Sequence, residues 1–263
     1  MATKFSKKTI DFLITAHKQT SMTWLDKHKA EHEELVIEPV RELALYLNAS
    51  LERKPQARGY KFAKRGFGRL RRPKHRVTAG EPAYRDWIHI QASRPSKSIF
   101  DDNPGLYFYM SPESTFLGGG LYNASSRQIK QMRAWIATDA KPLDKILKSK
   151  AFMAEFPDGL EMDKILKTFP RDYPQTHKRI DWLRLQAYYV TRQISRRELY
   201  SSELRDLVLE NWKQTLKFNE VLYDALADQS LMIAPSQARA DAPDEESDDD
   251  SKGSPTDLWD DRL

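Results

Sequence analysis

The sequence contains no cysteine, which excludes disulfide bonds, thiolate zinc sites and a cysteine nucleophile, and fits a reducing compartment. No stretch approaches the roughly 18 consecutive apolar residues of a membrane span. The first residues, MATKFSKK, lack the apolar run of a signal peptide. We therefore expect a soluble, cytoplasmic protein with no membrane partner.

Recognisable catalytic signatures are also missing. The chain matches neither the dinucleotide fingerprint nor the P-loop, and it has no hydrolase elbow and no metal triad. His28 and His32 lie four residues apart on a predicted helix, but a Glu does not follow the first His and no third ligand is evident, so a solvated helix face explains them better. We expect no cofactor and no metal site, and the sequence reveals no reaction.

The charge is divided between two parts of the chain. Residues 231–263 carry three basic and ten acidic side chains, so the overall net charge of +5 leaves +12 on residues 1–230. With 40% apolar and 11% aromatic residues in the whole chain, residues 1–230 can fill a core. We predict one domain over residues 1–230 and a disordered acidic tail over residues 231–263, which either solubilises the protein or folds back over its basic face.

Residues 53–76 are the strongest compositional anomaly. They contain eleven Lys or Arg and no acid, with Tyr60, Phe62 and Phe67 interleaved. Cations neutralise phosphates and aromatic rings stack on unpaired bases, so nucleic acid or another polyanion is a candidate partner. The alternative is a solvated basic loop whose aromatic residues face the core.

Residues 84–122 hold the clearest strand patterns. DWIHIQA and LYFYM alternate between apolar residues and a set of aromatic and polar residues, and SPES forms a turn before TFL. The pattern predicts an antiparallel hairpin whose apolar side chains face helices and whose other side chains face water or a cleft. The fold class expected is α+β, a mainly antiparallel sheet with helices packed from the N- and C-terminal regions.

Gly118, Gly119 and Gly120 follow this hairpin and precede a helix that starts with a capping box at Ser125 and Gln128. One interpretation is a glycine turn that cradles an anion at the helix N-terminus. The other is a bulge or a tight exit from a strand.

The remaining segments are mostly helical. Ser6 caps a first helix, and a second runs from Thr23 until Pro39 kinks or splits it. Pro142 opens another short helix, residues 164–169 read as a strand, a loop then leads into a helix containing Trp182, Leu183 and Leu185, and a long helix covers residues 202–227.

Four blocks of the chain, FSKKTIDFLITAHKQTSMTWLDKHKAEH, HRVTAGEPAYRDW, GLYFYMSPESTFLGGGLYNASSRQIKQMRAWI and LKTFPRDYPQTHKRIDWLRLQAYYV, resemble in their order an uncharacterised bacterial and fungal family. That family is known only as a domain of unknown function, and the resemblance spans roughly residues 5–225. It implies an α+β domain with no assigned activity. In its central motif, Pro73 follows Arg72 where the family usually has Asp, which weakens any role for a carboxylate there.

The resemblance singles out ligand-binding candidates without giving their role. They are Arg72, Arg76, Tyr84, Arg85, Gly118, Gly119, Gly120, Tyr122, His177 and Arg184, with Asp172 beside His177. If Arg76, Arg85 and Arg184 converge, they would form an anion pocket, since Arg binds phosphate or carboxylate in bidentate fashion. Alternatively these are internal ion pairs, for example of Arg184 with Asp172 or Asp86.

Three interpretations of function remain open. The first, which we favour from the sequence, is a domain that binds an anionic ligand, either a nucleic acid or a phosphorylated molecule, at a basic surface. The second is an enzyme acting on an anionic substrate, with His177 beside Asp172 or Asp181, or Tyr84 beside Arg85, as the reactive groups. The third is a structural or interaction protein without a pocket, and the sequence does not indicate an oligomeric state.

Overall fold

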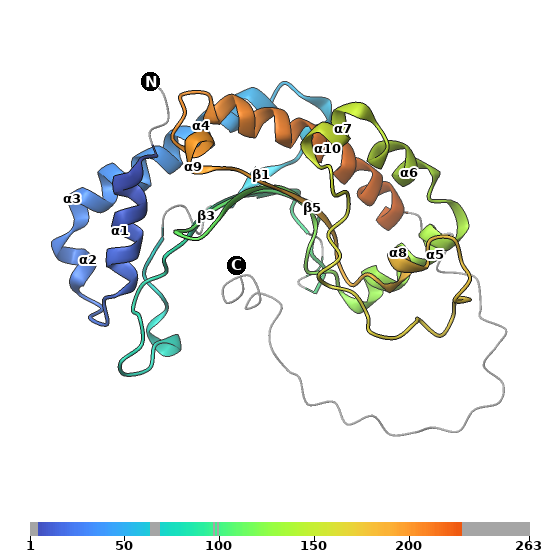
Figure 1. The fold of residues 1–263 in the computed structure, drawn as a ribbon, viewed down its shortest axis with the longest axis horizontal. Coiled ribbons are helices and arrows are strands. Elements are labelled where there is room, and N and C mark those ends of the chain that lie inside the picture. Colours follow the sequence, from blue (N-terminus) through green and yellow to red (C-terminus); the bar gives the residue numbers. More distant parts are fainter. Residues whose placement is uncertain (1–4, 64–68, 97, 99, 228–263) are drawn as a thin grey trace.

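The computed structural model describes residues 5–63, 69–96, 98 and 100–227. The predicted tail and part of the basic run, residues 64–68, lie outside the described residues. Figure 1 shows an arched molecule in which helices form the outer layer and a curved sheet the inner layer. The α+β class is confirmed, and none of the described helices is long and apolar enough to span a membrane.

The sheet has five antiparallel strands, each paired with its neighbours in chain order. The strands are β1 (Lys61–Phe62), β2 (Ile88–Ser93), β3 (Gly105–Met110), β4 (Thr115–Leu121) and β5 (Tyr188–Gln193). The predicted hairpin is confirmed as β3 and β4, joined by the turn at residues 111–114. In the β2–β3 pair Ile90 lies opposite Phe108 and Gln91 opposite Tyr107, so apolar and polar residues are sorted onto opposite faces.

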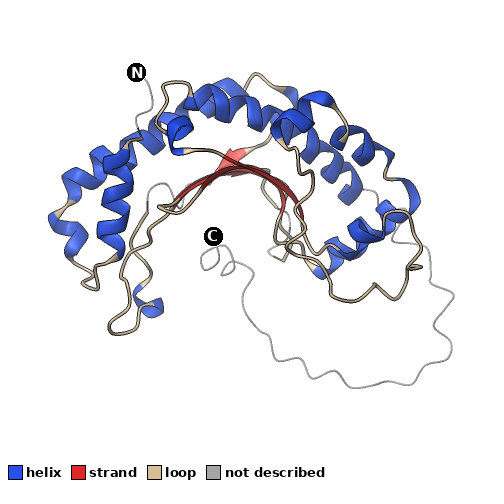
Figure 2. Ribbon diagram, viewed as in Figure 1, coloured by secondary structure: helices blue, strands red, loops and turns tan. Residues whose placement is uncertain are grey.

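The described helices cover the convex face of the sheet (Figure 2). The longest, α10 (Leu204–Ala227), packs on β3 and β4 and also contacts α4 (Glu38–Leu51) and α5 (Ser126–Asp139). Its buried Trp212 donates a hydrogen bond from the indole nitrogen to the carbonyl oxygen of Tyr107, at 3.2 Å. In the part of the chain that the structure describes, no helix crosses the concave face.

The N-terminal helices start where the sequence predicts, but the second one is divided at His28 as well as before Pro39. Ser6 forms a capping box with Thr9 at the start of α1 (Lys7–His17). The second predicted helix is split into α2 (Trp24–Lys27), α3 (Lys29–His32), a π-helical turn η1 (Glu33–Ile37) and α4. Pro39 lies in the first turn of α4 directly after the π-helical turn, and its missing N–H interrupts the helical hydrogen bonds there.

In the second half of the chain, Ser125 and Gln128 form the predicted capping box of α5. Short helices follow at α6 (Lys141–Leu147), α7 (Lys150–Glu155), α8 (Ile180–Arg184) and α9 (Arg196–Leu199). In the first half of the chain, between α4 and β2, short 3-10 turns occur at η2 (Pro55–Ala57) and η3 (Lys74–Arg76).

Two expectations for the second half of the chain are wrong, and one strand was missed. The strand predicted at residues 164–169 is reduced to one isolated bridge between Ile165 and Leu185. The helix that follows ends at Arg184, before Leu185. Residues 188–193, which the sequence analysis left unassigned after this helix, form the edge strand β5 on β4. Pairing with a strand some seventy residues earlier decided that segment, because its local pattern fits both states.

Candidate functional site

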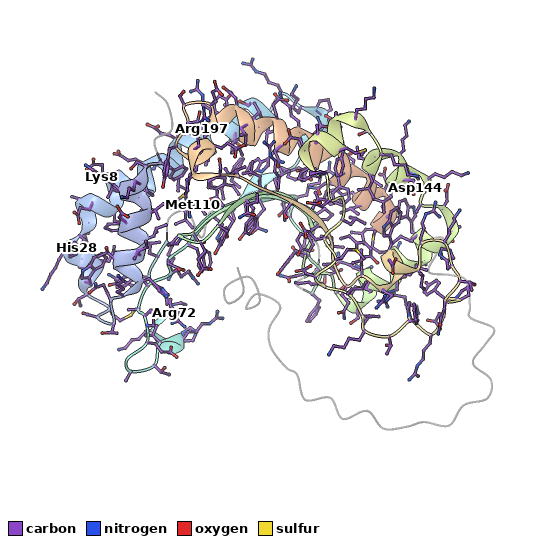
Figure 3. The ribbon with its side chains drawn as sticks, viewed as in Figure 1. Lys8, His28, Arg72, Met110, Asp144 and Arg197 are labelled. Atoms are coloured by element: carbon purple, nitrogen blue, oxygen red, sulfur yellow. The ribbon has the colours of Figure 1, made fainter. Side chains whose placement is uncertain are left out.

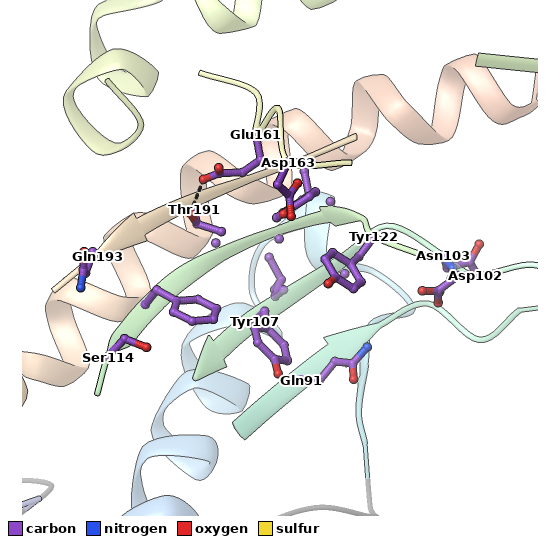
Figure 4. Close-up of a pocket in the computed structure, with 17 residues that line it drawn as sticks. Gln91, Asp102, Asn103, Tyr107, Ser114, Tyr122, Glu161, Asp163, Thr191 and Gln193 are labelled. Carbon is purple, nitrogen blue, oxygen red and sulfur yellow. Dashed lines mark hydrogen bonds between the residues drawn. The ribbon is translucent and has the colours of Figure 1, made fainter. Parts of the chain in front are cut away.

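A cavity of about 300 Å³ opens in the concave face of the sheet (Figure 4). Cross-strand partners share a face, and on this face Gly105 lies opposite Gly120 while Tyr107 lies opposite Gly118. The centre of the face is therefore carried by residues without side chains. The cavity exists because larger side chains surround Gly105, Gly118 and Gly120 on this face.

Gly118 and Gly120 cannot be replaced by larger residues without moving the backbone. Their φ angles are +151° and +129°, a region that side chains disfavour. A Cβ atom would lie 2.0 Å from the Val190 carbonyl oxygen at Gly118, and 2.4 Å from the Tyr188 carbonyl oxygen at Gly120. The glycines let β5 approach β4 and keep the cavity floor empty.

The interpretation of these three glycines as a turn that cradles an anion is wrong. Gly118, Gly119 and Gly120 all belong to β4, which is paired on both sides, with β3 and with β5. Gly119 points to the opposite face, where a Cβ would meet the Thr215 Cγ2 atom of α10 at 2.9 Å. The backbone of these glycines forms part of the sheet, and α5 starts at Ser126, six residues after Gly120.

Aromatic rings form the walls of the cavity. Tyr122 and Tyr189 meet nearly at right angles, with ring centroids 5.0 Å apart and an interplanar angle of 79°. Tyr107 and Phe116 are also lining residues, with centroids 6.1 Å apart. Two perpendicular rings make a corner that presents the negative π face of one ring beside the edge of the other.

Two carboxylates lie along the rim next to β5 (Figure 4). Glu161 accepts a hydrogen bond from the Thr191 hydroxyl, and its backbone N–H donates to the Tyr189 carbonyl oxygen at 3.0 Å. Asp163 is hydrogen-bonded by the Tyr189 side chain, and burial, with this hydrogen bond adding to it, raises the pKa of the Tyr189 hydroxyl. Within the described residues, neither carboxylate forms an ion pair.

A third carboxylate, that of Asp102, lies on the opposite side of the cavity (Figure 4). Burial raises the pKa of Asp102, although the backbone N–H groups of Asn103 and Asn123 pull it down. The Gln128 amide holds this loop in place by donating to the Asp102 carbonyl oxygen at 2.6 Å and accepting from the Ser125 N–H at 3.0 Å. The helix cap of α5 thus also positions one wall of the cavity.

A cation of the chain itself lies against the aromatic wall. The Lys164 ammonium is 3.2 Å from the centroid of the Tyr122 ring and 3.4 Å from the Tyr122 carbonyl oxygen. Its positive charge partly offsets the rise that burial causes in the pKa of Asp102. Among the described residues that line the cavity there are three acids, amides from Gln91, Asn103 and Gln193, and neither Lys nor Arg.

The structure brings only part of the predicted site together. Gly118, Gly119, Gly120 and Tyr122 line the cavity. Arg72 lies at the far end of one arm of the arch (Figure 3), and α8, which ends at Arg184, lies in the other (Figure 1). Arg76, Arg85 and Arg184 therefore do not converge on one pocket.

Arg72 and Tyr84 are held by contacts within their own arm. Arg72 donates to the carbonyl oxygens of Pro82 and Arg76, at 3.0 and 2.9 Å, and lies 3.6 Å from the Glu81 carboxylate. Tyr84 is fully buried, and its hydroxyl donates to the Ser21 carbonyl oxygen at 3.0 Å. These residues stabilise the loop that contains η3.

The remaining candidates are also engaged in protein contacts. The Arg85 guanidinium lies 4.8 Å from the Trp87 ring centroid. Arg184 donates to the Leu166 carbonyl oxygen, and its nearest acid is Asp181 at 3.5 Å rather than Asp172 or Asp86. His177 accepts from the Arg179 N–H at 3.1 Å, and neither His177 nor Asp172 is among the described residues lining the cavity.

The two histidines of the N-terminal helices pack against aromatic rings. His28 stacks on Trp24 with centroids 4.0 Å apart, and its Nδ1 atom lies 2.9 Å from the Trp24 carbonyl oxygen. His32 stacks on Phe12 at 6.0 Å. Over the described residues, no group of three His, Asp or Glu side chains is arranged to hold a metal ion.

Sequence analysis missed Asp102, Glu161, Asp163, Tyr189 and Thr191. The first three lie in loops without a motif, and the last two belong to the unpredicted strand β5. One signal was correct: strand alternation placed Gln91 and Tyr107 on the face turned to water or a cleft, and both line the cavity.

Comparisons with known proteins give a family and no function. Neither curated proteins nor solved structures include a significant match to this chain. Residues 8–220 match the family described as conserved hypothetical protein (DUF2461). The match covers most of the chain, including every strand of the sheet and every residue of the cavity, and the chain therefore belongs to this family.

Proposed function

We propose that this protein binds a small molecule in the cavity on the concave face of its sheet. The supporting observation is a sheet face that no described helix covers, combined with a glycine floor and aromatic walls. Ligand sites of proteins are concave, lined mostly by apolar and aromatic groups, and oriented by a few polar side chains. The cavity, at about 300 Å³, lies at the lower end of the volumes typical of such sites.

The walls are held in place without a ligand. Gln128 fixes the loop of Asp102, Thr191 fixes Glu161, and Tyr189 fixes Asp163. These side chains therefore lose little conformational entropy when a ligand binds, which favours binding.

Thr191 offers a way to fill the cavity without disturbing the core. It lies on the edge strand β5, half-buried, with its side chain on the concave face opposite Gly118. Thr191→Phe would place a ring in the cavity, whereas Thr191→Val removes the hydroxyl and keeps the volume. The pair separates loss of space from loss of the hydrogen bond to Glu161.

The test is saturation-transfer NMR with a fixed set of compounds that all carry C–H protons: phenol, choline, putrescine, glucose and methyl phosphate. We expect at least one compound to receive saturation from the wild-type protein and from Thr191→Val, and to lose it with Thr191→Phe. Circular dichroism and thermal unfolding confirm that the variants fold. Identical signals from Thr191→Phe and the wild-type protein would contradict the proposal.

A second candidate function is the binding of nucleic acid or another polyanion at a basic surface. The observation that favours it is a basic patch, which we define as Arg53, Lys54, Lys213 and Lys217. These residues line two neighbouring shallow depressions between the end of α4 and α10. The net charge of +12 on residues 1–230 adds a long-range attraction for polyanions.

Binding of single-stranded RNA and DNA at two salt concentrations tests this second function, with and without residues 231–263. We expect salt-sensitive binding that strengthens without the acidic tail, because counterion release drives such binding. The triple change Lys54→Glu, Lys213→Glu and Lys217→Glu should abolish it. The matched control, Lys141→Glu, Lys145→Glu and Lys150→Glu, changes three exposed lysines of α6 and α7 by the same charge. Equal losses in both triple variants would argue against a localised surface.

A further inference from the structure

The lining of the cavity is acidic, in contrast to the basic charge of residues 1–230. Its described lining carries three carboxylates and neither Lys nor Arg, although the body of the protein is strongly basic. An anionic ligand would meet repulsion from these acids. A neutral ligand would make no use of this charge, which is exposed to solvent at Asp163 and half-buried at Glu161.

One of the three acids already has a cation nearby. Lys164 acts on Asp102 and rests on the face of Tyr122, 3.2 Å from the ring centroid. Glu161 and Asp163, on the opposite rim, have only hydroxyl and backbone donors among the described residues. Glu161 and Asp163 are therefore the two acids of the lining that have no cationic partner among the described residues, and Asp163 is open to solvent.

The aromatic corner suits a cation as well. The Lys164 ammonium already occupies a face of Tyr122, so a ligand cation would meet the other aromatic rings of the lining, those of Tyr189, Tyr107 and Phe116. Tyr189 stands at 79° to Tyr122, and Tyr107 and Phe116 complete the aromatic lining. Aromatic rings arranged around a cavity recognise organic ammonium ions through cation–π attraction.

We infer that the ligand of this cavity is a small organic ammonium ion, held by the aromatic walls and balanced by Glu161 and Asp163. The inference rests on the proposed small-molecule function and names its ligand class. The aromatic rings contact the alkyl groups around the nitrogen, and the two carboxylates supply the charge. Glycine at positions 118 and 120 leaves the room in which the ion lies.

The experiment compares cations with neutral molecules of the same shape by isothermal titration calorimetry. The pairs are choline with 3,3-dimethylbutan-1-ol, and putrescine with butane-1,4-diol. We expect at least one cation to bind the wild-type protein about tenfold or more tightly than its neutral counterpart, the preference given by desolvated cation–π contacts. In the double variant Glu161→Gln and Asp163→Asn, that ratio should fall toward one, since the amides keep the shape and remove the charge.

A control variant separates local charge from net charge. Asp158→Asn with Asp172→Asn removes two acids that are exposed and absent from the cavity lining, and should preserve the ratio. The inference is overturned if neither cation exceeds its neutral counterpart, or if the control variant loses the preference as fully as the double variant.

Failure of the inference can be told from failure of the proposed function. If phenol, glucose or methyl phosphate loses its NMR signal in Thr191→Phe while both cations bind no better than the neutral molecules, the cavity binds a ligand of another class. If no compound is sensitive to Thr191→Phe, both proposals fall.

Discussion

The convex face of the sheet is built from Ile88, Ile90, Leu106, Phe108 and Leu117, all of them buried against helices. On the other face, the same strands carry His89, Gln91, Tyr107 and Tyr109 around adjacent glycines, and no described helix crosses them. Both sets of residues follow the same alternation along the strands. The two faces differ in what packs on them: helices bury the apolar face, and the other face contains the cavity.

The aromatic groups illustrate this division. Trp212 of α10 is fully buried against the convex face and packs 6.0 Å from the Phe62 ring. Tyr107, Tyr109 and Trp87 are also mostly buried, but chiefly by one another and by Phe116 in a separate cluster on the concave side. Of this cluster, Tyr107 and Phe116 are the described members that line the cavity.

Truncation of the convex core should have the largest effect. Trp212→Ala removes a buried indole and its hydrogen bond to Tyr107, and we expect it to lower the free energy of unfolding by about 3–5 kcal/mol. Gln91→Ala, on the concave face, should change it by no more than about 0.5 kcal/mol. Urea unfolding followed by circular dichroism measures both, and equal losses would erase the contrast between the faces.

Substitution of the cavity floor should follow in size. Gly120→Ala forces a Cβ to within 2.4 Å of the Tyr188 carbonyl oxygen in a strained backbone region, and we expect a loss of about 3 kcal/mol. Gly80 has a φ of +89° but nothing within 4 Å of its Cβ position, so Gly80→Ala isolates the backbone strain, about 1 kcal/mol. The same unfolding measurement applies, and a smaller loss at Gly120 than at Gly80 would show that β4 and β5 can move apart.

The smallest effect concerns the pH dependence of the concave face. Burial raises the pKa of Asp102 in the folded protein, so the folded state binds this proton more tightly than the unfolded state does. The contribution of Asp102 to stability therefore falls as pH rises from the ordinary Asp pKa through the raised value. Asp102→Asn removes this titration.

We expect the unfolding free energy of Asp102→Asn, relative to the wild-type protein, to be higher at pH 7 than at pH 4. Denaturant unfolding at both pH values measures the difference. A difference that does not change with pH would show that Asp102 titrates alike in both states.

The sequence by itself determined the features that depend on neighbouring residues. Alternation defined β2 and the β3–β4 hairpin, and the spacing of Ser125 and Gln128 defined the start of α5. The amphipathic pattern of residues 202–227 predicted α10. These signals are local, since a strand repeats every two residues and a helix about every 3.6.

Net charge could not predict the character of the cavity. The basic body suggested an anion site, and the family resemblance drew attention to arginines that the structure spreads between two arms of the arch. The sign of a local field depends on which segments meet, and no composition records that residues 161–163 lie against β5.

Only the tertiary structure decided the role of the glycines and the existence of the cavity. Three consecutive glycines fit a turn, a bulge or a strand, and pairing with β3 on one side and β5 on the other selects the strand. β5 itself became a strand because β4 offered it a partner far away in sequence. Because α10 packs on the side of β4 to which Gly119 points, that face is buried and the cavity lies on the opposite face.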